Sequence, residues 1–494
     1  MKESTQVLVI GGGPGGSSAA TMLARQGFDV TLLERDFFPR EHIGESLLPS
    51  AMDILDTLGV REKVEAHGFV RKFGLYFEWG PDTWSSVWGK STDPAPMYSF
   101  QVVRAEFDQI LLEHARSQGV SVHEGVEVTS LDFEGERPRR AAWRERGGEG
   151  RSGEIAFDWL VDASGRAGIM STRYLRNRRF NKAFQSVAVW GYWKNVPMPP
   201  RAPEGGVTVA AVEDGWVWLI PLHDGTMSVG LVVHKNSFKA RREESGSLEQ
   251  LYRDGVVESP LVAELLRDGE LVSSIEAEQD FSYLAERSAG PGYFMVGDAA
   301  CFLDPLLASG IHLATYSALL AAASIASVAR GEVAEDEATA YYESTYRQAY
   351  VRFMLLVTSL YQEYRGKNTL FWQAKQLTTG DVRDTDLMQA FARLVTGSED
   401  MRFAREGSGV LSLDEVQRFI NQAFHEARQV KRETLMAMPE DEREALVAKV
   451  KVVNSALDMS LSPEHAVGGL YVRTEPQLGL ARAEAEAPLA STGV

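Results

Sequence analysis

The sequence predicts an α/β protein with a doubly wound domain that contains a GxGxxG turn, an inserted antiparallel β-sheet domain and a helical C-terminal part. The first part is predicted by residues 1 to about 35, which follow the order strand, glycine turn, helix, strand. The second is predicted by Phe184 to Val233, where apolar residues alternate and two Asp-Gly pairs mark turns. The third is predicted by two long helical stretches, Ile311 to Ala329 and Glu335 to Arg365.

Between these landmarks, strand and helix patterns alternate along the chain. Arg104 to Ser117 predicts an amphipathic helix, and Val120 to Leu131 predicts strands. Glu134 to Glu154 is charged and contains glycine, which is typical of a solvated hairpin. Phe157 to Val161 and Tyr293 to Val296 are short apolar runs and predict buried strands.

These elements predict domain boundaries. We expect the doubly wound domain to be discontinuous, over residues 1–80, 100–180 and 285–330. The β-sheet substrate domain is expected over residues 81–99 and 181–284. A helical C-terminal region is expected over residues 331–480, with a helical segment from about Phe371 to Ala456, and the Ala/Glu-rich residues 481–494 are expected to be a disordered tail.

Composition excludes several classes of protein. The 494 residues are 44% hydrophobic and 24% charged, which is ordinary for a chain that buries a core. The net charge of −18 argues against binding to nucleic acid or to an anionic membrane, since both need clustered Lys and Arg. The lone cysteine, Cys301, excludes an intramolecular disulfide and a Cys-rich metal site, and we expect no metal. Cys301 itself is expected to be a small buried residue.

We expect the protein to be cytoplasmic and independent of membranes. Met1 to Gln6 is polar and leads directly into a strand, unlike a signal peptide. Ile311 to Ala329 is apolar, but it contains His312 and Thr315, which favours a buried helix over a membrane span.

The glycine turn predicts a dinucleotide site. Gly11, Gly13 and Gly16 follow a strand and precede a helix, where backbone amides and the helix dipole favour a diphosphate. Glu34 ends the next strand, about twenty residues on, where a carboxylate can accept hydrogen bonds from a ribose. An Asp that ends a strand is often a simple helix cap, but Asp298 in Gly297-Asp298-Ala299-Ala300 resembles the C-terminal flavin motif of FAD-dependent hydroxylase-fold enzymes. Because no second glycine motif stands between a predicted strand and helix, FAD is favoured over a separate NAD(P)H site.

Three motifs resemble those of the flavin-dependent halogenases, especially the branch that acts on phenols and pyrroles. The segment from Trp216 to Pro221 matches the WxWxIP pattern of that family, with Trp218 and Ile220 at the matching positions. Lys72 matches the catalytic lysine of the family, and Ser309 with Gly310 match its halide-binding amides. The tryptophans share one face of a strand, and the resemblance implies that they separate the substrate from the flavin.

The same resemblance implies a set of cofactor contacts. The segment from Gly44 to Pro49 resembles the family's stretch beside the flavin, and Arg104 resembles its FAD-contacting arginine. The expected cofactor-binding residues are Gly11, Gly13, Pro14, Gly16, Glu34, Arg35, Glu45, Ser46, Arg104, Val128, Asp162, Ala163, Asp298, Pro305, Gly310 and Ile311.

The resemblance implies an FADH2- and O2-dependent enzyme that oxidises chloride or bromide to hypohalous acid and delivers it to Lys72. As an ammonium, Lys72 would polarise hypochlorous acid; as a neutral amine, it could form a chloramine. Tryptophan halogenases place a catalytic glutamate where this chain has Leu307, which favours chlorination of an electron-rich phenol or pyrrole, free or tethered to a carrier protein.

A separate NAD(P)H-dependent flavin reductase is the expected partner, because Asp162-Ala163-Ser164-Gly165 lacks the Asp-Gly pair of hydroxylases that bind NADPH. The alternatives are an FAD-dependent monooxygenase, an alkene-reducing flavoenzyme and a non-catalytic FAD-fold protein. On the helix after residue 335, Tyr346, Tyr350 and Phe353 share a face that is more typical of core than of a substrate pocket.

Overall fold

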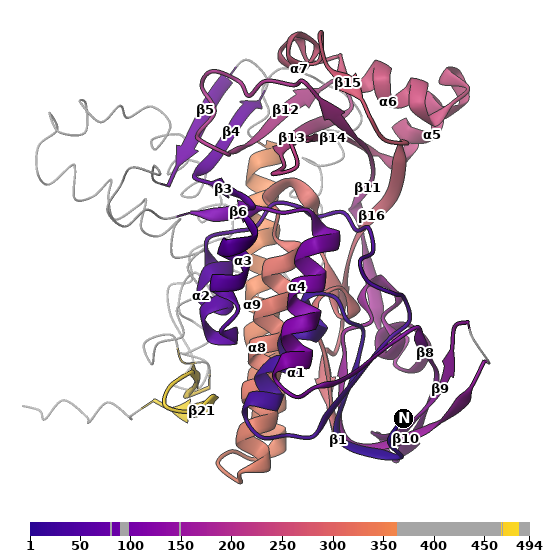
Figure 1. Cartoon of the computed structure of the whole chain (residues 1–494), viewed down its shortest axis with the longest axis vertical. Helices are drawn as coiled ribbons and strands as arrows, with labels where there is room; N and C mark the ends of the chain where they lie inside the picture. The colour runs from indigo at the N-terminus through magenta and orange to yellow at the C-terminus, as the bar shows by residue number, and fades with distance from the viewer. Residues whose placement is uncertain (80–81, 89–97, 148–149, 363–465, 467, 484–494) are drawn as a thin grey trace, which may run out of the picture.

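The structure is a computed structural model that describes residues 1–79, 82–88, 98–147, 150–362, 466 and 468–483. Of two large sheets, the second lies at the top of Figure 1 and the first at the lower right, and two long helices run along the length of the molecule. The predicted helical segment 371–456 lies outside the described residues, as do residues 89–97 and 484–494 of the expected domains.

The first sheet confirms the doubly wound domain. Its central strands β10, β1, β2 and β7 are parallel, with β18 parallel on the other side of β10. Val7 to Ile10 are almost completely buried, which agrees with their unbroken apolar run, as expected for a parallel strand at the centre of a sheet. The eight strands are β1 (Ser4–Ile10), β2 (Val30–Glu34), β7 (Ser121–Glu124), β8 (Val126–Glu134), β9 (Arg137–Glu145), β10 (Ser152–Asp162), β17 (Ala289–Gly290) and β18 (Tyr293–Met295).

The parallel core is assembled from segments distant in sequence. The strand β18 pairs with β10 although more than a hundred residues separate them in sequence. Helix α1 (Pro14–Arg25) packs against α4 (Arg104–Ser117) and α8 (Gly310–Ala329). The charged residues 134–147 and 150–154 belong to the antiparallel β8–β9–β10 extension, in agreement with the predicted hairpin.

The second sheet confirms an inserted β domain but corrects its boundaries. The order is β19-β16-β11-β14-β13-β12-β4-β5, with β15 on β11, and all its pairs are antiparallel except β12 with β4. Its strands are β4 (Gly74–Trp79), β5 (Asp82–Val87), β11 (Arg178–Lys194), β12 (Val207–Val212), β13 (Gly215–Pro221), β14 (Met227–His234), β15 (Glu270–Leu271), β16 (Glu276–Ala285) and β19 (Cys301–Phe302).

Two strands of this sheet, β4 and β19, come from segments that the sequence assigned to the doubly wound domain. Strand pairing is a long-range contact, so residue spacing within β4 does not reveal its partner. The segment 235–265 is helical, as α5 (Lys235–Ser245), α6 (Leu248–Val256) and α7 (Pro260–Leu265). Leu251, Tyr252 and Val262 of these helices form a second core with β11, β13 and β14.

The two long C-terminal helices are confirmed, as α8 and α9 (Glu335–Gln362), and they pack against each other (Figure 1). Helix α8 is long and apolar enough to cross a bilayer, but 89% of its most apolar window is buried inside the fold. It is therefore a core helix. The expectation of helix to residue 480 is wrong at its end, because β20 (Leu470–Arg473) and β21 (Gly479–Arg482) form a hairpin against α8.

Three short elements lie between β2 and β4 in the chain. Helices α2 (Ser50–Leu58) and α3 (Arg61–His67) both end at glycines with positive φ, Gly59 and Gly68, a standard helix C-terminus. Strand β3 (Val70–Lys72) follows and pairs with β6 (Ser99–Gln101), so Lys72 lies on a fixed ladder beside Ser99.

Candidate active site

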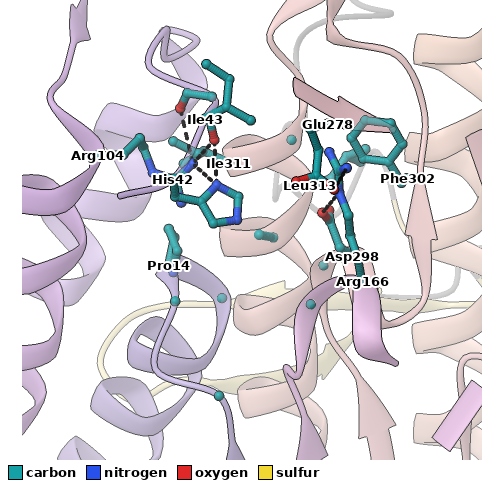
Figure 2. Close-up of a pocket in the computed structure, with 18 of the residues that line it drawn as sticks. Pro14, His42, Ile43, Arg104, Arg166, Glu278, Asp298, Phe302, Ile311 and Leu313 are labelled. Atoms are coloured by element: carbon teal, nitrogen blue, oxygen red, sulfur yellow. Dashed lines mark hydrogen bonds and ion pairs between the residues drawn. The ribbon is translucent and has the colours of Figure 1, made fainter. Parts of the chain in front are cut away.

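A cavity of about 780 Å³ lies between the two sheets. It extends from the glycine turn and Glu34 to Trp216 and Trp218 of β13. Figure 2 shows its two sides: His42 and Arg104 project from one, and Arg166 with Asp298 from the other. The parallel strands β1 and β10 end at this cavity, which is where doubly wound folds bind ligands.

Two glycines of the turn are required by close backbone packing. A Cβ on Gly11 would lie 2.2 Å from the Ala163 oxygen, and Gly11 has a φ of +104°. A Cβ on Gly16 would lie 1.9 Å from the Gly11 oxygen. In contrast, Gly13 caps α1 and borders the cavity, and the nearest atom to its Cβ position is an Arg40 nitrogen at 3.4 Å. The helix N-terminus is therefore open towards the cavity.

Glu34 lines the cavity and also holds the turn. Its Oε2 accepts a hydrogen bond of 2.6 Å from the Gly12 amide, and its Oε1 accepts one of 2.8 Å from the Asp36 amide. The carboxylate is 5% exposed. The carboxylate therefore orders the backbone that a dinucleotide would approach.

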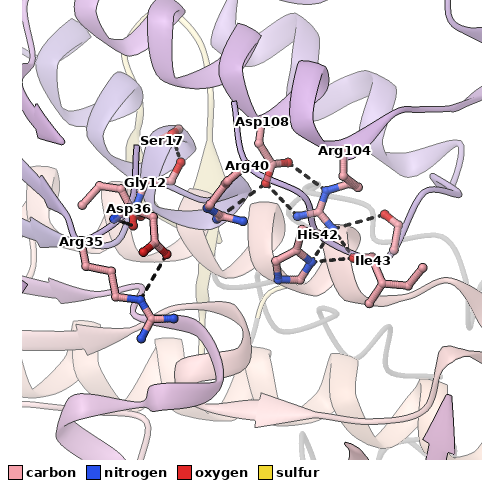
Figure 3. A network of polar contacts seen from close by, with 11 residues as sticks. Gly12, Ser17, Arg35, Asp36, Arg40, His42, Ile43, Arg104 and Asp108 are labelled. Carbon is pink, nitrogen blue, oxygen red and sulfur yellow. Dashed lines mark hydrogen bonds and ion pairs between the residues drawn. The ribbon is translucent and has the colours of Figure 1, made fainter. Parts of the chain in front are cut away.

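Arg104 organises the loop on one side of the cavity (Figure 3). Its guanidinium donates two hydrogen bonds to Asp108, at 2.8 and 2.9 Å, and one of 2.6 Å to the Ile43 oxygen. It also lies 3.2 Å from Nδ1 of His42. The positive charge of Arg104, together with burial, lowers the pKa of His42 to about 3, so this imidazole stays neutral.

The cavity of this acidic protein is rich in arginine. Those that line it are Arg35, Arg40, Arg104, Arg166 and Arg173. Carboxylates balance some of this charge, since Arg166 lies 2.9 Å from Glu278 and 3.8 Å from Asp298. Guanidinium groups and an open helix N-terminus suit an anionic diphosphate, so the lining fits a dinucleotide such as FAD.

The two tryptophans of β13 form one wall of the cavity. Their rings lie 6.0 Å apart, and both side chains are nearly buried. The Trp218 Nε1 donates to Ser228 at 3.1 Å, and the Trp218 ring occupies the space in which a Cβ on Gly230 would lie, 2.0 Å from the ring. Ile220 lines the same cavity. The shared strand face predicted from spacing is therefore present.

Tyr361 links this wall to the loop before α8, and the sequence did not identify it. The Trp216 Nε1 donates to the Tyr361 Oη at 3.0 Å, and the Tyr361 hydroxyl lies 3.2 Å from both oxygens of Asp304. Asp304 in turn accepts from the Leu306 amide at 3.1 Å. Tyr361 is on α9, 145 residues after Trp216, so no local pattern could have paired them.

Lys72 lies next to the cavity but does not line it. Its side chain is 1% exposed, and its amine donates to the Ser46 hydroxyl at 2.8 Å and the Leu47 oxygen at 3.1 Å. Ser46 lines the cavity. The Trp88 ring lies 4.9 Å from Nζ. Both hydrogen-bond partners are neutral, and desolvation lowers the pKa of Lys72 to about 7.

Glu45 is a buried acid on the cavity wall. It is 2% exposed, and burial raises its pKa to about 7, against the opposing effect of hydrogen bonds from Ser228 and Tyr192. Burial thus brings the pKa values of both Glu45 and Lys72 to about 7, and Lys72 hydrogen-bonds Ser46, the residue that follows Glu45. The sequence predicted Glu45 only as a cofactor contact.

The N-terminus of α8 opens onto the same cavity. Ser309 caps the helix and is 2% exposed. Gly310 is exposed, and within the described part of the chain no atom lies within 4 Å of its Cβ position. The preceding Ala308 has a φ of +53°, an uncommon conformation for a residue with a side chain. The turn thus directs the α8 amides into the cavity.

The structure brings most predicted site residues together, but four do not line the cavity. They are Gly16, Asp162, Pro221 and Lys72. Asp162 instead accepts hydrogen bonds from the Ser164 and Met170 amides and is completely buried. It supports the turn after β10 through local capping, which a strand-terminal Asp in a sequence does not distinguish from ligand contact.

The aromatic face of α9 is buried without lining the cavity. Tyr346 contacts the Gly297 oxygen and Cys301, and Tyr350 hydrogen-bonds Ser282. Cys301 is 1% exposed, as expected for a small buried residue. His312 is buried, and its Nδ1 lies 2.8 Å from the Ser50 hydroxyl.

Comparisons with known proteins agree with this geometry. A family model described as FAD binding domain matches residues 4–353. A curated protein named tryptophan 2-halogenase, from Chondromyces crocatus, is 44% identical and is aligned over 98% of this chain and 95% of its own length. Flavin-dependent halogenase armH2 of Armillaria mellea is 42% identical, over 74% of each chain.

Solved structures are similar over the whole fold. The myxobacterial chondrochloren halogenase CndH, described as an FAD-dependent halogenase, has a TM-score of 0.71 and 34% identity, over 85% of this chain and 97% of its own. The flavin-dependent halogenase CmlS has a TM-score of 0.75 and 31% identity, over 99% of this chain and 88% of its own.

Proposed function

Since this chain belongs to the flavin-dependent halogenases, we propose that it uses FADH2, O2 and chloride or bromide to halogenate an electron-rich aromatic compound, with Lys72 as the catalytic residue. One observation carries the proposal. The buried amine of Lys72 is joined through Ser46 to the cavity that also holds the tryptophan wall and the N-terminus of α8.

FAD would be held by the glycine turn, Glu34 and the arginines of the cavity. When bound in its reduced form, FAD supplies the electrons that reduce O2 and so allow a halide to be oxidised to hypohalous acid. Arg104 keeps the 42–44 loop against the cavity, and Arg166 faces it from the opposite side (Figure 2). A separate NAD(P)H-dependent reductase would deliver the reduced flavin.

The halide would bind at the amides of Ser309 and Gly310. Helix α8 is 20 residues long, and the partial positive charge of its N-terminus favours an anion. Gly310 leaves the approach open, since no atom of the described residues lies within 4 Å of its Cβ position. Asp304 and Tyr361 fix the turn before this helix and also the adjacent Trp216.

Lys72 would receive hypochlorous acid behind the wall formed by Trp216 and Trp218. With a pKa of about 7, both its ammonium and its amine are populated near neutral pH. The ammonium can donate a hydrogen bond to the hypochlorous oxygen and polarise the O–Cl bond. The amine can instead attack chlorine, forming an N–Cl bond as the O–Cl bond breaks and water leaves. In either case the buried amine keeps the oxidant away from bulk water.

The substrate is an aromatic ring carbon activated by an adjacent heteroatom. Leu307 stands where a catalytic glutamate would assist less reactive ring positions, which favours a phenol or a pyrrole. The relative from Chondromyces crocatus is named for position 2 of tryptophan. Position 2 of an indole is a pyrrole-ring carbon, so this name and Leu307 point to the same electronic requirement. Indole therefore joins phenol and pyrrole as a candidate substrate.

The test is an assay with an added flavin reductase, NADH, chloride and free or carrier-bound phenols, pyrroles and tryptophan. Wild type should give products with a chlorine isotope pattern. Lys72→Ala should lose chlorination while flavin is still reoxidised by O2, and Lys239→Ala, which removes an exposed lysine of α5, should behave as wild type. Retained chlorination by Lys72→Ala would refute the role of Lys72. A product that gains oxygen without chlorine would indicate a monooxygenase instead.

A further inference from the structure

A cluster of two histidines and one glutamate lies outside the halogenation cavity. His67 ends α3, Glu106 is in the first turn of α4, and His223 follows β13. The Nε2 atoms of both imidazoles face the same carboxylate oxygen of Glu106, at 2.6 Å from His67 and 3.1 Å from His223. The three ligand atoms lie within 4.8 Å of one another.

Aromatic packing holds both imidazoles in place. The Phe69 ring is 4.4 Å from the His67 ring and 5.1 Å from the His223 ring. Phe69 is 4% exposed and contacts Phe107 of α4. The two imidazoles are not stacked on each other, since their planes meet at 65°. Their orientation is therefore set before any ligand binds, with nitrogen atoms directed to a common point.

We propose that His67, Glu106 and His223 form a binding site for a divalent transition metal ion of the zinc type. Two imidazole nitrogens and one carboxylate oxygen are a donor set that Zn²⁺ accepts, with a fourth position left to water. Around a tetrahedral ion with bonds of about 2.0–2.1 Å, donor atoms are about 3.3 Å apart, so the three atoms need to shift by about 1 Å. The side chains are 20–40% exposed, which permits that shift.

Open space for the fourth ligand lies next to the cluster. A cavity of about 330 Å³ is lined by His67 and Glu106 and also by Gln109 and Glu113. Among the described residues that line it, the ammonium of Lys63 is directed to His114, at 3.0 Å from its Nδ1. Glu113 is ion-paired with Arg116, so Glu106 is the carboxylate that this space offers to a cation.

A bound ion would join the two sheet domains. His67 and Glu106 belong to helices that pack on the doubly wound domain, whereas His223 lies in the turn between β13 and β14 of the second sheet. The ion would restrain the end of the strand that holds the tryptophan wall. Its role would be structural, and it does not depend on the halogenation proposal.

The experiment uses the full chain with bound flavin, treated with a chelator and titrated with ZnCl2 by calorimetry. Wild type should bind one ion and show a higher melting temperature with zinc. Glu106→Gln and His223→Ala should each weaken binding by about tenfold or more, since even outer-shell changes cost that much. Glu113→Gln, which changes a carboxylate on the same small cavity, should keep the wild-type affinity.

Cobalt provides a second measurement that does not depend on stability. Wild type with Co²⁺ should show the visible absorption of a tetrahedral site, and His67→Ala should lose it while its circular dichroism matches wild type. Absence of one-to-one zinc binding by wild type would overturn the proposal. So would equal affinities of wild type, Glu106→Gln and His223→Ala, because the cluster would then be only a hydrogen-bonded group.

Discussion

Replacing Lys72 by methionine should stabilise the fold, and the gain should shrink as pH rises. Burial lowers the pKa of Lys72 from 10.5 to about 7, so the folded state releases a proton that the unfolded state keeps. The cost of burying the charge is complete below about pH 7 and disappears above the unfolded pKa. Wild type should therefore gain stability as pH rises through this window, whereas Lys72→Met should not.

The magnitude follows from the size of the pKa shift. One pKa unit corresponds to about 1.4 kcal/mol, so the cost in wild type is about 4 kcal/mol near pH 7 and about 2 kcal/mol near pH 9. Methionine removes this cost and leaves little unsatisfied, because the Leu47 oxygen still accepts from the Ser99 hydroxyl at 2.8 Å. The stability difference should hence narrow by about 2 kcal/mol over this range.

Equilibrium urea unfolding at several pH values between neutral and mildly alkaline measures the difference. Lys239→Met, which changes an exposed lysine of α5, serves as the control and should differ from wild type by the same amount at every pH. A difference between Lys72→Met and wild type that does not change with pH would refute the reasoning. The amine would then keep its proton in the fold, in contact with water or a counter-charge.

Three substitutions test how the cavity is built. Tyr361→Phe leaves the buried Trp216 Nε1 without its acceptor. It should therefore destabilise the fold by about 1–3 kcal/mol in urea unfolding and raise the KM for chloride. Wild-type values for both quantities would contradict the structural link between Tyr361 and Trp216. Gly16→Ala forces a Cβ to within 1.9 Å of the Gly11 oxygen. The variant should therefore lose FAD binding in a flavin fluorescence titration. FAD binding at wild-type affinity would show that the backbone packing around Gly16 is not required. Gly230→Ala places a Cβ where the Trp218 ring lies, so the ring must move. The amount of chlorinated product formed per NADH consumed should fall while peroxide release rises. An unchanged ratio of product to NADH would show that the tryptophan wall tolerates the movement of Trp218.

Features based on local spacing could be predicted well. The glycine turn, the parallel strand ends and the two long helices each depend on residues within about twenty positions of one another. The position of Tyr361 shows why other features were missed. Its hydroxyl joins Trp216 and Asp304, and neither lies near it in sequence. A tyrosine on an apolar helix face looks like any other core residue until its neighbours are known.

Local patterns along the chain were enough to predict the fold class, the two tryptophans on one face of β13 and the candidate catalytic lysine, because periodicity and motif residues are properties of short segments. Three features became visible only in the folded protein: β4 joins the second sheet, a hairpin replaces helix near residue 475, and Lys72 lies behind Ser46, where its two hydrogen-bond partners among the described residues are neutral. Strand pairing and desolvation depend on atoms that folding brings together from distant parts of the chain. The lowered pKa of Lys72 is therefore a property of its surroundings in the fold, and the residue itself reveals only that an amine is present.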